Sequence, residues 1–213
     1  MNLDATLDRL ESLCVASSPE PPPPAPTCPR CTLPQLDLDG VHPSVVEAHS
    51  ATRKWVGDIL HNRRPPYWLT LYGNCGCGKT LLASHARHFL GSLGSQVELR
   101  NWPRVLEAIY NKDEGVLHQM MTTPILILDD VGAEYTASNK TSRFSASKLY
   151  LLAESRLGKW TFITSNLDYN AMRQEIGDRF ASRVYRNSAT VIDMSKAADY
   201  SYEQWRKLRH QNS

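Results

Sequence analysis

One stretch, residues 67 to 80, limits what this chain can fold into more than any other. It reads YWLTLYGNCGCGKT, a short apolar run followed by the pattern G-x-x-x-x-G-K-[ST]. The glycines of such a loop let the backbone turn tightly and point successive N–H groups inward, where the positive end of the following helix adds to them. The stretch therefore predicts a buried strand, a phosphate-binding loop and a helix.

The polar residues of this loop suit a nucleoside triphosphate. We expect the Lys79 ammonium to bind the β and γ phosphates and the Thr80 hydroxyl to ligate Mg²⁺. Cys75 and Cys77 stand at variable positions, where the backbone matters more than the side chain, so we interpret them as incidental. A glycine-rich surface turn is the structural alternative. The expected nucleotide-binding residues are Gly73, Asn74, Cys75, Gly76, Cys77, Gly78, Lys79, Thr80 and Leu81.

A second motif with chemistry is the run PILILDDVGAE at residues 124 to 134. Four consecutive aliphatic residues are typical of a central parallel strand buried on both faces. Ligands of open α/β sheets bind at the carboxyl ends of the strands, so Asp129 and Asp130 are expected beside the phosphate loop. We expect Asp129 to hold the Mg²⁺ shell and Asp130 to orient or deprotonate the attacking water. A buried strand that ends in a capped, solvated turn is the alternative.

Further patterns complete an α/β fold with a central parallel sheet flanked by helices. The run KWTFITSN at 159 to 166 predicts another buried strand, and Asn166 at its end is a candidate to bind the γ-phosphate or the attacking water. The polar segment 137 to 144 is either a mobile loop that contacts polymer phosphate or a solvated connection. The other expected elements are a helix from 44 to 62 with Ser44 as N-cap, strands at 96–102 and 190–194, a helix at 103–121 interrupted near Gly115, and helices at 145–157, 170–176, 178–186 and 200–210.

Residues 1 to 42 form an N-terminal extension of an ATPase domain that we expect to span residues 43 to 213. The proline-rich tract SSPEPPPPAP cannot be helical and separates a short amphipathic helix from the domain as a semi-rigid spacer. Such a helix either docks on a partner protein or folds back on its own domain. Its apolar stripe consists of Leu3, Leu7, Leu10, Leu13 and Cys14.

A pair of cysteines in the extension, Cys28 and Cys31, has the C-x-x-C spacing of half a zinc site. Cys14 and His42 are conceivable further ligands for Zn²⁺, but their spacing matches no standard ligand set well. The alternatives are two unligated thiols or a site that another subunit completes.

Charge and hydropathy indicate which partners the protein binds and in which compartment it acts. Residues 1 to 42 carry two basic and six acidic side chains, and the rest of the chain carries 22 basic and 16 acidic ones. An acidic extension and a basic main body suit a tail that meets protein and a core that meets phosphate. Because the sequence contains no bilayer-length apolar run and no signal-peptide pattern, we expect a cytoplasmic protein, in which five cysteines do not form a disulfide framework.

Four motifs in this order and spacing, GNCGCGKT, ILILDDVGAE, FITSN and GDRFASRV at 177 to 184, resemble the AAA+ ATPases of the DnaC/DnaI helicase-loader group. The resemblance covers about residues 43 to 194 and includes phage-encoded members. By position, the functional residues of the family correspond to Lys79 and Thr80 of Walker A, Asp129 and Asp130 of Walker B, Asn166 of sensor 1 and Arg183 of the arginine finger, with Arg179 as the runner-up.

The resemblance implies an ATP- and Mg²⁺-dependent protein of a bacterial or phage-infected cell. Such a protein binds a hexameric replicative helicase, here through residues 1 to 42, and delivers it to single-stranded DNA. An arginine finger acts in the site of a neighbouring subunit, so Arg183 implies assembly into a ring or spiral. An ordinary exposed helical arginine is the alternative for Arg183.

Two departures from the AAA+ pattern accompany the resemblance. Asp130 stands where most AAA+ proteins have glutamate, and its shorter side chain reaches less far, which indicates slow hydrolysis. We expect a partner or single-stranded DNA to regulate this activity. Too few residues follow Asn166 for a C-terminal helical lid, which the loader group also lacks. The competing functions are an IstB-like helper of a transposase, a P-loop small-molecule kinase and a module that holds ATP without hydrolysing it.

Overall fold

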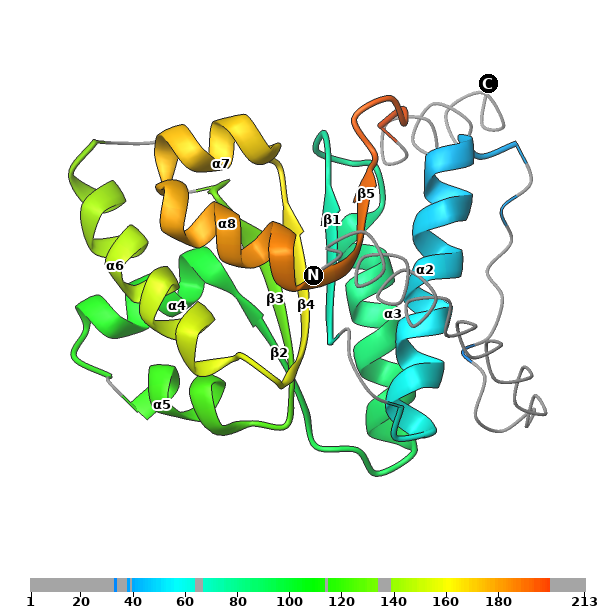
Figure 1. The fold of residues 1–213 in the computed structure, drawn as a ribbon, viewed down its shortest axis with the longest axis horizontal. Coiled ribbons are helices and arrows are strands. Elements are labelled where there is room, and N and C mark those ends of the chain that lie inside the picture. Colours follow the sequence, from blue (N-terminus) through cyan, green and yellow to red (C-terminus); the bar gives the residue numbers. More distant parts are fainter. Residues whose placement is uncertain are drawn as a thin grey trace, which may run out of the picture.

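The computed structural model describes residues 33, 38, 40–63, 67–113, 115–133 and 139–199. A five-stranded sheet forms the centre of these residues, in the order β2-β3-β4-β1-β5, and every pair of neighbouring strands is parallel (Figure 1). The predicted parallel α/β sheet is therefore confirmed. The strands are β1 (Trp68–Tyr72), β2 (Val97–Asn101), β3 (Ile125–Val131), β4 (Trp160–Ser165) and β5 (Ser188–Asp193).

Helices cover both faces of the sheet, as a parallel sheet requires. One face carries α2 (Pro43–Leu60) and α3 (Lys79–Ser92) (Figure 1). The other face carries α4 (Trp102–Tyr110), α5 (Gly115–Thr122), α6 (Asn139–Ser155), α7 (Tyr169–Glu175) and α8 (Asp178–Asn187). Among the described residues, none of the helices combines the length and apolar character needed to cross a membrane.

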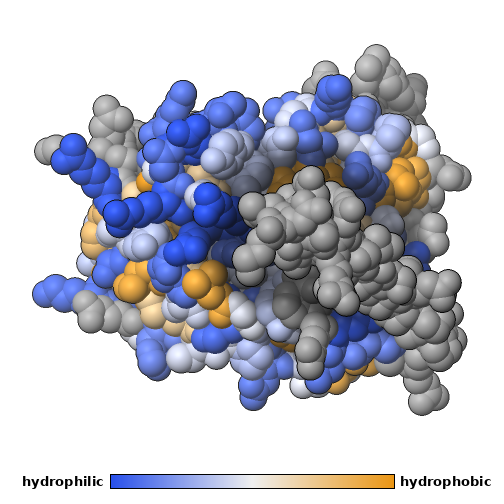
Figure 2. Space-filling view, viewed as in Figure 1, coloured by the Kyte–Doolittle hydropathy of each residue, from blue (hydrophilic) through white to orange (hydrophobic). Residues whose placement is uncertain are grey.

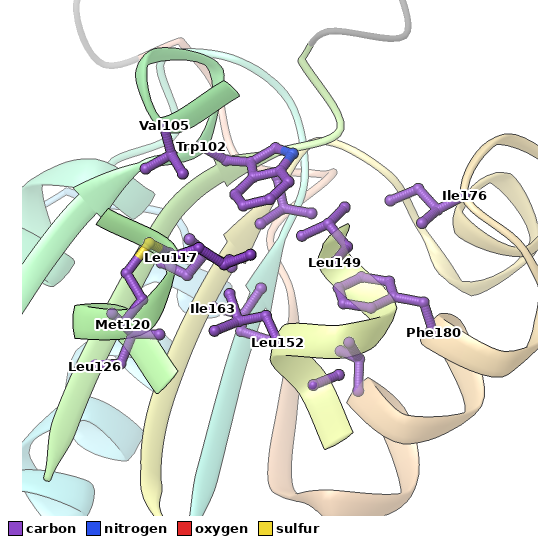
Figure 3. Packing of buried hydrophobic residues seen from close by; sticks show 14 of the residues in the cluster. Trp102, Val105, Leu117, Met120, Leu126, Leu149, Leu152, Ile163, Ile176 and Phe180 are labelled. Atoms are coloured by element: carbon purple, nitrogen blue, oxygen red, sulfur yellow. The ribbon is translucent and has the colours of Figure 1, made fainter. Parts of the chain in front are cut away.

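Each face of the sheet has its own hydrophobic core. On the side of α4 to α8, Trp102, Ile163 and Phe180 pack together with aliphatic side chains of α5 and α6 (Figure 3). On the side of α2 and α3, Trp55 packs edge-on against Phe162, with ring centroids 5.5 Å apart. Leu33 belongs to this second core and is fully buried, so the core includes at least one residue of the N-terminal extension.

Several predicted boundaries are wrong in detail. His42, and not Ser44, is the N-cap of α2, because Pro43 stands at the start of the helix and the His42 ring accepts a hydrogen bond from the Ser44 N–H. By contrast, the expected interruption of the helix at 103–121 is confirmed, since the chain turns at Lys112, which has a φ of 67°, and α5 begins at Gly115. The predicted polar loop at 137–144 lies in α6 from Asn139 onward, and this helix has no glycine or proline to interrupt it.

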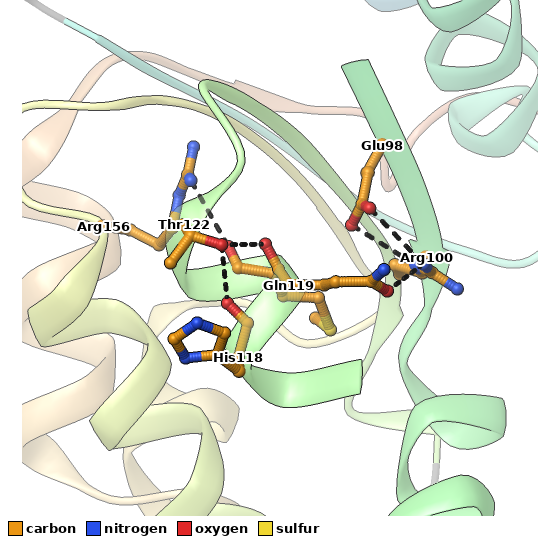
Figure 4. A network of polar contacts seen from close by, with 7 residues as sticks. Glu98, Arg100, His118, Gln119, Thr122 and Arg156 are labelled. Atoms are coloured by element: carbon orange, nitrogen blue, oxygen red, sulfur yellow. Dashed lines mark hydrogen bonds and ion pairs between the residues drawn. The ribbon is translucent and has the colours of Figure 1, made fainter. Parts of the chain in front are cut away.

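A fully buried arginine, Arg156, follows α6 directly and links the amino-terminal ends of β3 and β4 to α5. Its guanidinium donates to the carbonyls of residues at the end of α5 and the starts of β3 and β4. Figure 4 shows Arg156 beside residues of α5, from which further polar contacts lead to Arg100 and Glu98. Burial lowers the pKa of Arg156 to about 10, so the group is still charged at neutral pH and its bonds are charge-assisted. The acceptors are the carbonyls of Met120, Thr123, Pro124 and Trp160 and the hydroxyl of Thr161.

Replacing this arginine should destabilise the domain strongly. Arg156→Met leaves several buried carbonyls without donors, and we expect a loss of about 3–5 kcal/mol in the free energy of unfolding. For a domain of this size that corresponds to a fall of roughly 10 °C in melting temperature, measurable by circular dichroism. Arg100 is a matched control, because it bonds Gln119 at 3.1 Å on the surface of the same network; Arg100→Gln should cost less than about 1 kcal/mol. Equal losses for the two variants would contradict this role of Arg156.

Candidate nucleotide-binding site

The predicted phosphate loop joins β1 to α3 at the carboxyl edge of the sheet (Figure 1). Gly76 and Gly78 have φ values of 77° and 96°, which side chains rarely tolerate, and Gly78 is the N-cap of α3. The loop residues between β1 and α3 therefore lead directly into the positive end of a helix of 14 residues. Backbone N–H groups at such an end suit an anion.

Lys79 lies folded against the loop itself. Its ammonium donates to the carbonyls of Gly73 and Asn74, both at 2.7 Å, and lies 3.6 Å from the sulfur of Cys77. The side chain is buried, so these carbonyls replace the water that the ammonium has lost. A phosphate group bound in the loop would give the Lys79 ammonium a charged acceptor in place of these two neutral carbonyls. A hydrogen bond between two charged groups is the stronger one.

The loop and β3 meet through Thr80 and Asp129. The Thr80 hydroxyl donates to the two carboxylate oxygens of Asp129 at 3.0 and 3.2 Å, and the Thr164 hydroxyl of β4 donates to the first of them at 2.6 Å. Asp129 is almost completely buried, so these donors stabilise its charge. The two motifs that the sequence places 49 residues apart are thus in direct contact.

The carboxyl end of β3 contains a bulge that presents the second aspartate. Leu128 pairs with Ile163 and Val131 with Ser165, so Asp129 and Asp130 together stand opposite the single residue Thr164. The Asp130 N–H donates to the Thr164 hydroxyl at 2.9 Å, and Asp130 has a φ of 64°. This left-handed conformation is uncommon for a residue other than glycine, although aspartate tolerates it better than most.

The protonation of Asp130 reflects this position. Burial raises its pKa above the ordinary 3.8, and the neighbouring Asp129 charge raises it further. The Lys79 ammonium and a hydrogen bond from the Asn101 side chain oppose the shift. A carboxylate with a raised pKa is a stronger base than an ordinary one, which suits a group that takes a proton from water.

Asn166, directly after β4, has a buried amide oxygen with no hydrogen-bond partner among the described residues. The end of β4 is held to β3, because the Ser165 hydroxyl donates to the Val131 carbonyl at 2.7 Å. Gly132 leaves room for Leu167, whose Cδ1 would lie 2.5 Å from a Cβ at this glycine, and the Asn166 oxygen lies next to the same position at 3.3 Å. An unsatisfied polar atom at this edge needs a partner that the described residues do not supply.

The residues present fit a magnesium ion. Mg²⁺ prefers oxygen ligands and usually retains water while bound by one or two carboxylates and substrate phosphates. The Thr80 hydroxyl and the Asp129 carboxylate supply such oxygens in contact with each other, and Asp130 adds a second carboxylate nearby. Bound there, the ion would neutralise phosphate charge.

The remaining predicted loop residues have different environments. Asn74 donates to the carbonyl of Ser195 at 2.7 Å, and the free thiols of Cys75 and Cys77 are exposed and buried, respectively. Leu81 is 56% exposed on the first turn of α3. Two residues of the site were not predicted: Thr164 stands inside the TSN motif, and Asn101, the N-cap of α4, stands at the end of β2.

The predicted arginine finger lies away from this cluster. Arg183 is on α8, on the face of the sheet opposite α3, where its Nε donates to Glu154 of α6 at 2.6 Å. Figure 2 shows hydrophilic side chains gathered over the α6 and α8 side of the molecule. A hollow of about 360 Å³ opens there, lined by Tyr150, Asp178, Arg179, Ser182, Arg183 and Arg186.

The cysteines of the proposed zinc site, Cys14, Cys28 and Cys31, lie outside the described residues. Within the described ranges, no group of three or more His, Cys, Asp or Glu side chains is arranged to hold a metal. His42, the fourth conceivable ligand, bonds Ser44 through Nδ1.

Solved structures share this architecture, although no protein-family model and no curated protein matches the sequence. The crystal structure of DnaI matches with a TM-score of 0.63 and 19% identity, over 80% of this chain and 90% of that one. The crystal structure of the DnaC helicase loader matches with a TM-score of 0.57 and 23% identity, over 71% of this chain and 91% of that one. DnaA from Aquifex aeolicus, with AMPPCP bound, matches with 0.58 and 17%, over 87% of this chain and 56% of DnaA.

These likenesses, all below 25% identity, establish the fold. The chain has the AAA+ fold that occurs in helicase loaders and replication initiators, as its motifs predicted. It spans most of the length of DnaI and DnaC but only 56% of the DnaA chain.

Replacing Asp130 should separate activity from stability. Asp130→Asn keeps the shape and the tolerance of a positive φ but cannot accept a proton, so ATP hydrolysis should fall about 10²–10⁴-fold. The raised pKa means that folding favours protonated Asp130, so the wild type loses stability as pH rises through that pKa. The melting temperature of Asp130→Asn should therefore exceed that of the wild type at pH 7, and the difference should shrink as pH falls toward 4.

Asp130→Glu is the control for this experiment, because it keeps a carboxylate and should retain hydrolysis. Full activity in Asp130→Asn would rule out the base role, and a lower melting temperature at pH 7 would contradict the direction of the pKa shift.

Proposed function

We propose that this chain is an ATP-binding and ATP-hydrolysing helicase loader that delivers a hexameric replicative helicase to single-stranded DNA. The observation that carries the proposal is the contact of Thr80 with Asp129 at the carboxyl edge of the sheet. A hydroxyl and a carboxylate suited to Mg²⁺ thus lie beside a loop with a buried ammonium, and these are the groups that phosphoryl transfer needs. The AMPPCP bound to DnaA and the name of DnaC as a helicase loader support the same reading.

In this mechanism the chain supplies positioning and charge. Lys79 would exchange its carbonyl partners for the β and γ phosphates, and Thr80 and Asp129 would hold a Mg²⁺ ion that offsets the phosphate charge. Asp130 accepts a proton from the attacking water, whose position Asn166 fixes with its unpartnered amide oxygen. The short side chain of Asp130 favours slow hydrolysis, and on this proposal single-stranded DNA or the partner regulates it.

A neighbouring copy of the chain completes the site. Arg183 lies on the sheet face opposite α3, so its guanidinium is suited to serve another subunit more than its own. Glu154 pairs with the Nε edge of the guanidinium at 2.6 Å, and the Arg183 side chain is 39% exposed, so a neighbouring subunit can reach it. We therefore expect assembly into a ring or spiral, in which Arg183 stabilises the transition-state charge of the adjoining site.

The helicase partner, on this proposal, binds residues 1 to 42, and the protein acts in the cytoplasm of a bacterial or phage-infected cell. The amphipathic stripe predicted for residues 3 to 14 offers an apolar face for a groove on the partner. The basic balance of residues 43 to 213 suits contact with DNA phosphates.

The shared site can be tested by mixing inactive variants. Lys79→Ala should abolish ATP binding, and Arg183→Ala should bind ATP but hydrolyse it at least 10³-fold more slowly. A mixture should recover hydrolysis, because Lys79→Ala subunits still donate Arg183 to intact sites on their neighbours. The measurement is phosphate release with single-stranded DNA present.

Two neighbours of Arg183 sharpen that test. Arg186→Ala, in the same hollow, should hydrolyse ATP like the wild type. If Arg179→Ala and not Arg183→Ala is rescued by mixing, the finger is Arg179. Hydrolysis in Lys79→Ala alone would overturn the nucleotide site itself.

Capture of the replicative helicase tests the partner. Leu7→Glu with Leu10→Glu puts charge on the predicted apolar stripe and should weaken capture of the purified helicase at least tenfold, with the ATPase domain unaltered. Asp8→Asn, between the two leucines, should capture it like the wild type. Unchanged capture by the double variant would remove the extension from the proposal.

A further inference from the structure

The segment that follows β5, Met194 to Asp199, runs directly across the phosphate loop. A Cβ at Gly73 would lie 2.6 Å from the carbonyl carbon of Met194 and 2.8 Å from the nitrogen of Ser195, so the two backbones are packed together. The Asn74 amide reinforces the contact by donating to the Ser195 carbonyl at 2.7 Å. Figure 1 shows the turn after β5 beside the turn after β1.

This segment has a defined shape of its own. The Ser195 N–H and hydroxyl both donate to Asp193, at 2.8 and 2.5 Å, and the Ala197 N–H donates to the Met194 carbonyl at 3.1 Å. Met194 and Ala197 are buried in the same core as α2 and α3. The segment is therefore anchored beside the loop by two side chains and several hydrogen bonds.

The segment brings a carboxylate to the centre of the loop. A Cβ at Gly76 would overlap the Asp199 carboxylate, whose Oδ1 is the nearest atom. Asp199 thus touches the glycine at the midpoint of GNCGCGKT, where the positive field of the α3 N-terminus and of Lys79 acts. This field attracts a carboxylate for the same reason that it attracts a phosphate.

We infer that Asp199 is a further determinant of the nucleotide site: its charge lowers the affinity of the loop for nucleoside triphosphates. The inference rests on the proposed nucleotide binding. The triphosphate and Asp199 are both anionic and share one loop, so each bound nucleotide is repelled by the carboxylate or displaces it. Because Asp199 is largely exposed, water and salt screen this repulsion, and we expect an effect of about fivefold on affinity.

The coupling between Asp199 and the nucleotide is reciprocal. If Asp199 weakens nucleotide binding by a given free energy, then bound nucleotide destabilises the present position of the segment by the same free energy. The segment is anchored at Met194 and Ala197, two residues short of Asp199. Nucleotide binding should therefore shift the end of the segment while its anchored part stays on the core.

The test is nucleotide affinity by titration calorimetry with full-length protein. Asp199→Asn keeps the shape and removes the charge, so it should bind ATP about fivefold more tightly than the wild type. This gain in affinity should decrease from ATP to ADP to AMP, because the phosphate charge decreases in that order. It should also be smaller at about 500 mM than at about 50 mM salt, because salt screens the repulsion between exposed charges. Asp199→Glu, which keeps the charge, should bind like the wild type.

Asp113→Asn is the control, because it makes the same change in net charge at an exposed turn after α4. It should leave the affinity for ATP unchanged. Equal affinities of Asp199→Asn and wild type would overturn the inference, and weaker binding would show that the carboxylate contacts the nucleotide favourably. Either result leaves the proposed function standing as long as the wild type binds ATP and Lys79→Ala does not; absence of Lys79-dependent binding would instead refute the proposed function.

Discussion

The site depends on one buried charge, the carboxylate of Asp129. A carboxylate that has lost its water needs donors, and here the donors are two threonine hydroxyls, Thr80 from the first turn of α3 and Thr164 from β4. One anion thereby fixes the positions of the phosphate loop, the central strand and its neighbour. The Thr80 hydroxyl and the Asp129 carboxylate that bond each other are also the groups that would hold Mg²⁺, so one contact serves both the structure of the site and its proposed chemistry.

The fold could be predicted from the sequence where the signal is local. A glycine loop before a helix and an aliphatic strand ending in two carboxylates each occupy fewer than a dozen residues, and both are found where the patterns place them. Residues whose role depends on strand order were missed. Thr164 reaches Asp129 because β4 lies between β3 and β1, and Asn101 reaches Asp130 because β2 lies next to β3. No local sequence pattern predicts this strand order.

Helix boundaries were missed for a different reason. We interpreted Ser44 and the polar segment at 137–144 from side-chain preference alone. Pro43, however, sets the start of α2, and α6 begins at Asn139 with no glycine or proline to interrupt its helical hydrogen bonds. Propensity is a weak prior in such places, because tertiary packing decides between neighbouring starts. The contact of Asp199 with Gly76 was beyond prediction altogether, since it requires β5 to lie beside β1.

The bulge at the end of β3 explains why the two aspartates differ although they are adjacent. Two residues opposite one cannot both continue the ladder, so Asp129 points to the hydroxyl donors while Asp130 takes a left-handed conformation with its N–H on Thr164. One carboxylate is thus paired and the other is half-buried beside a like charge, which raises its pKa. A regular strand would have sent the two side chains to opposite faces of the sheet, and only one of them could then have reached the loop.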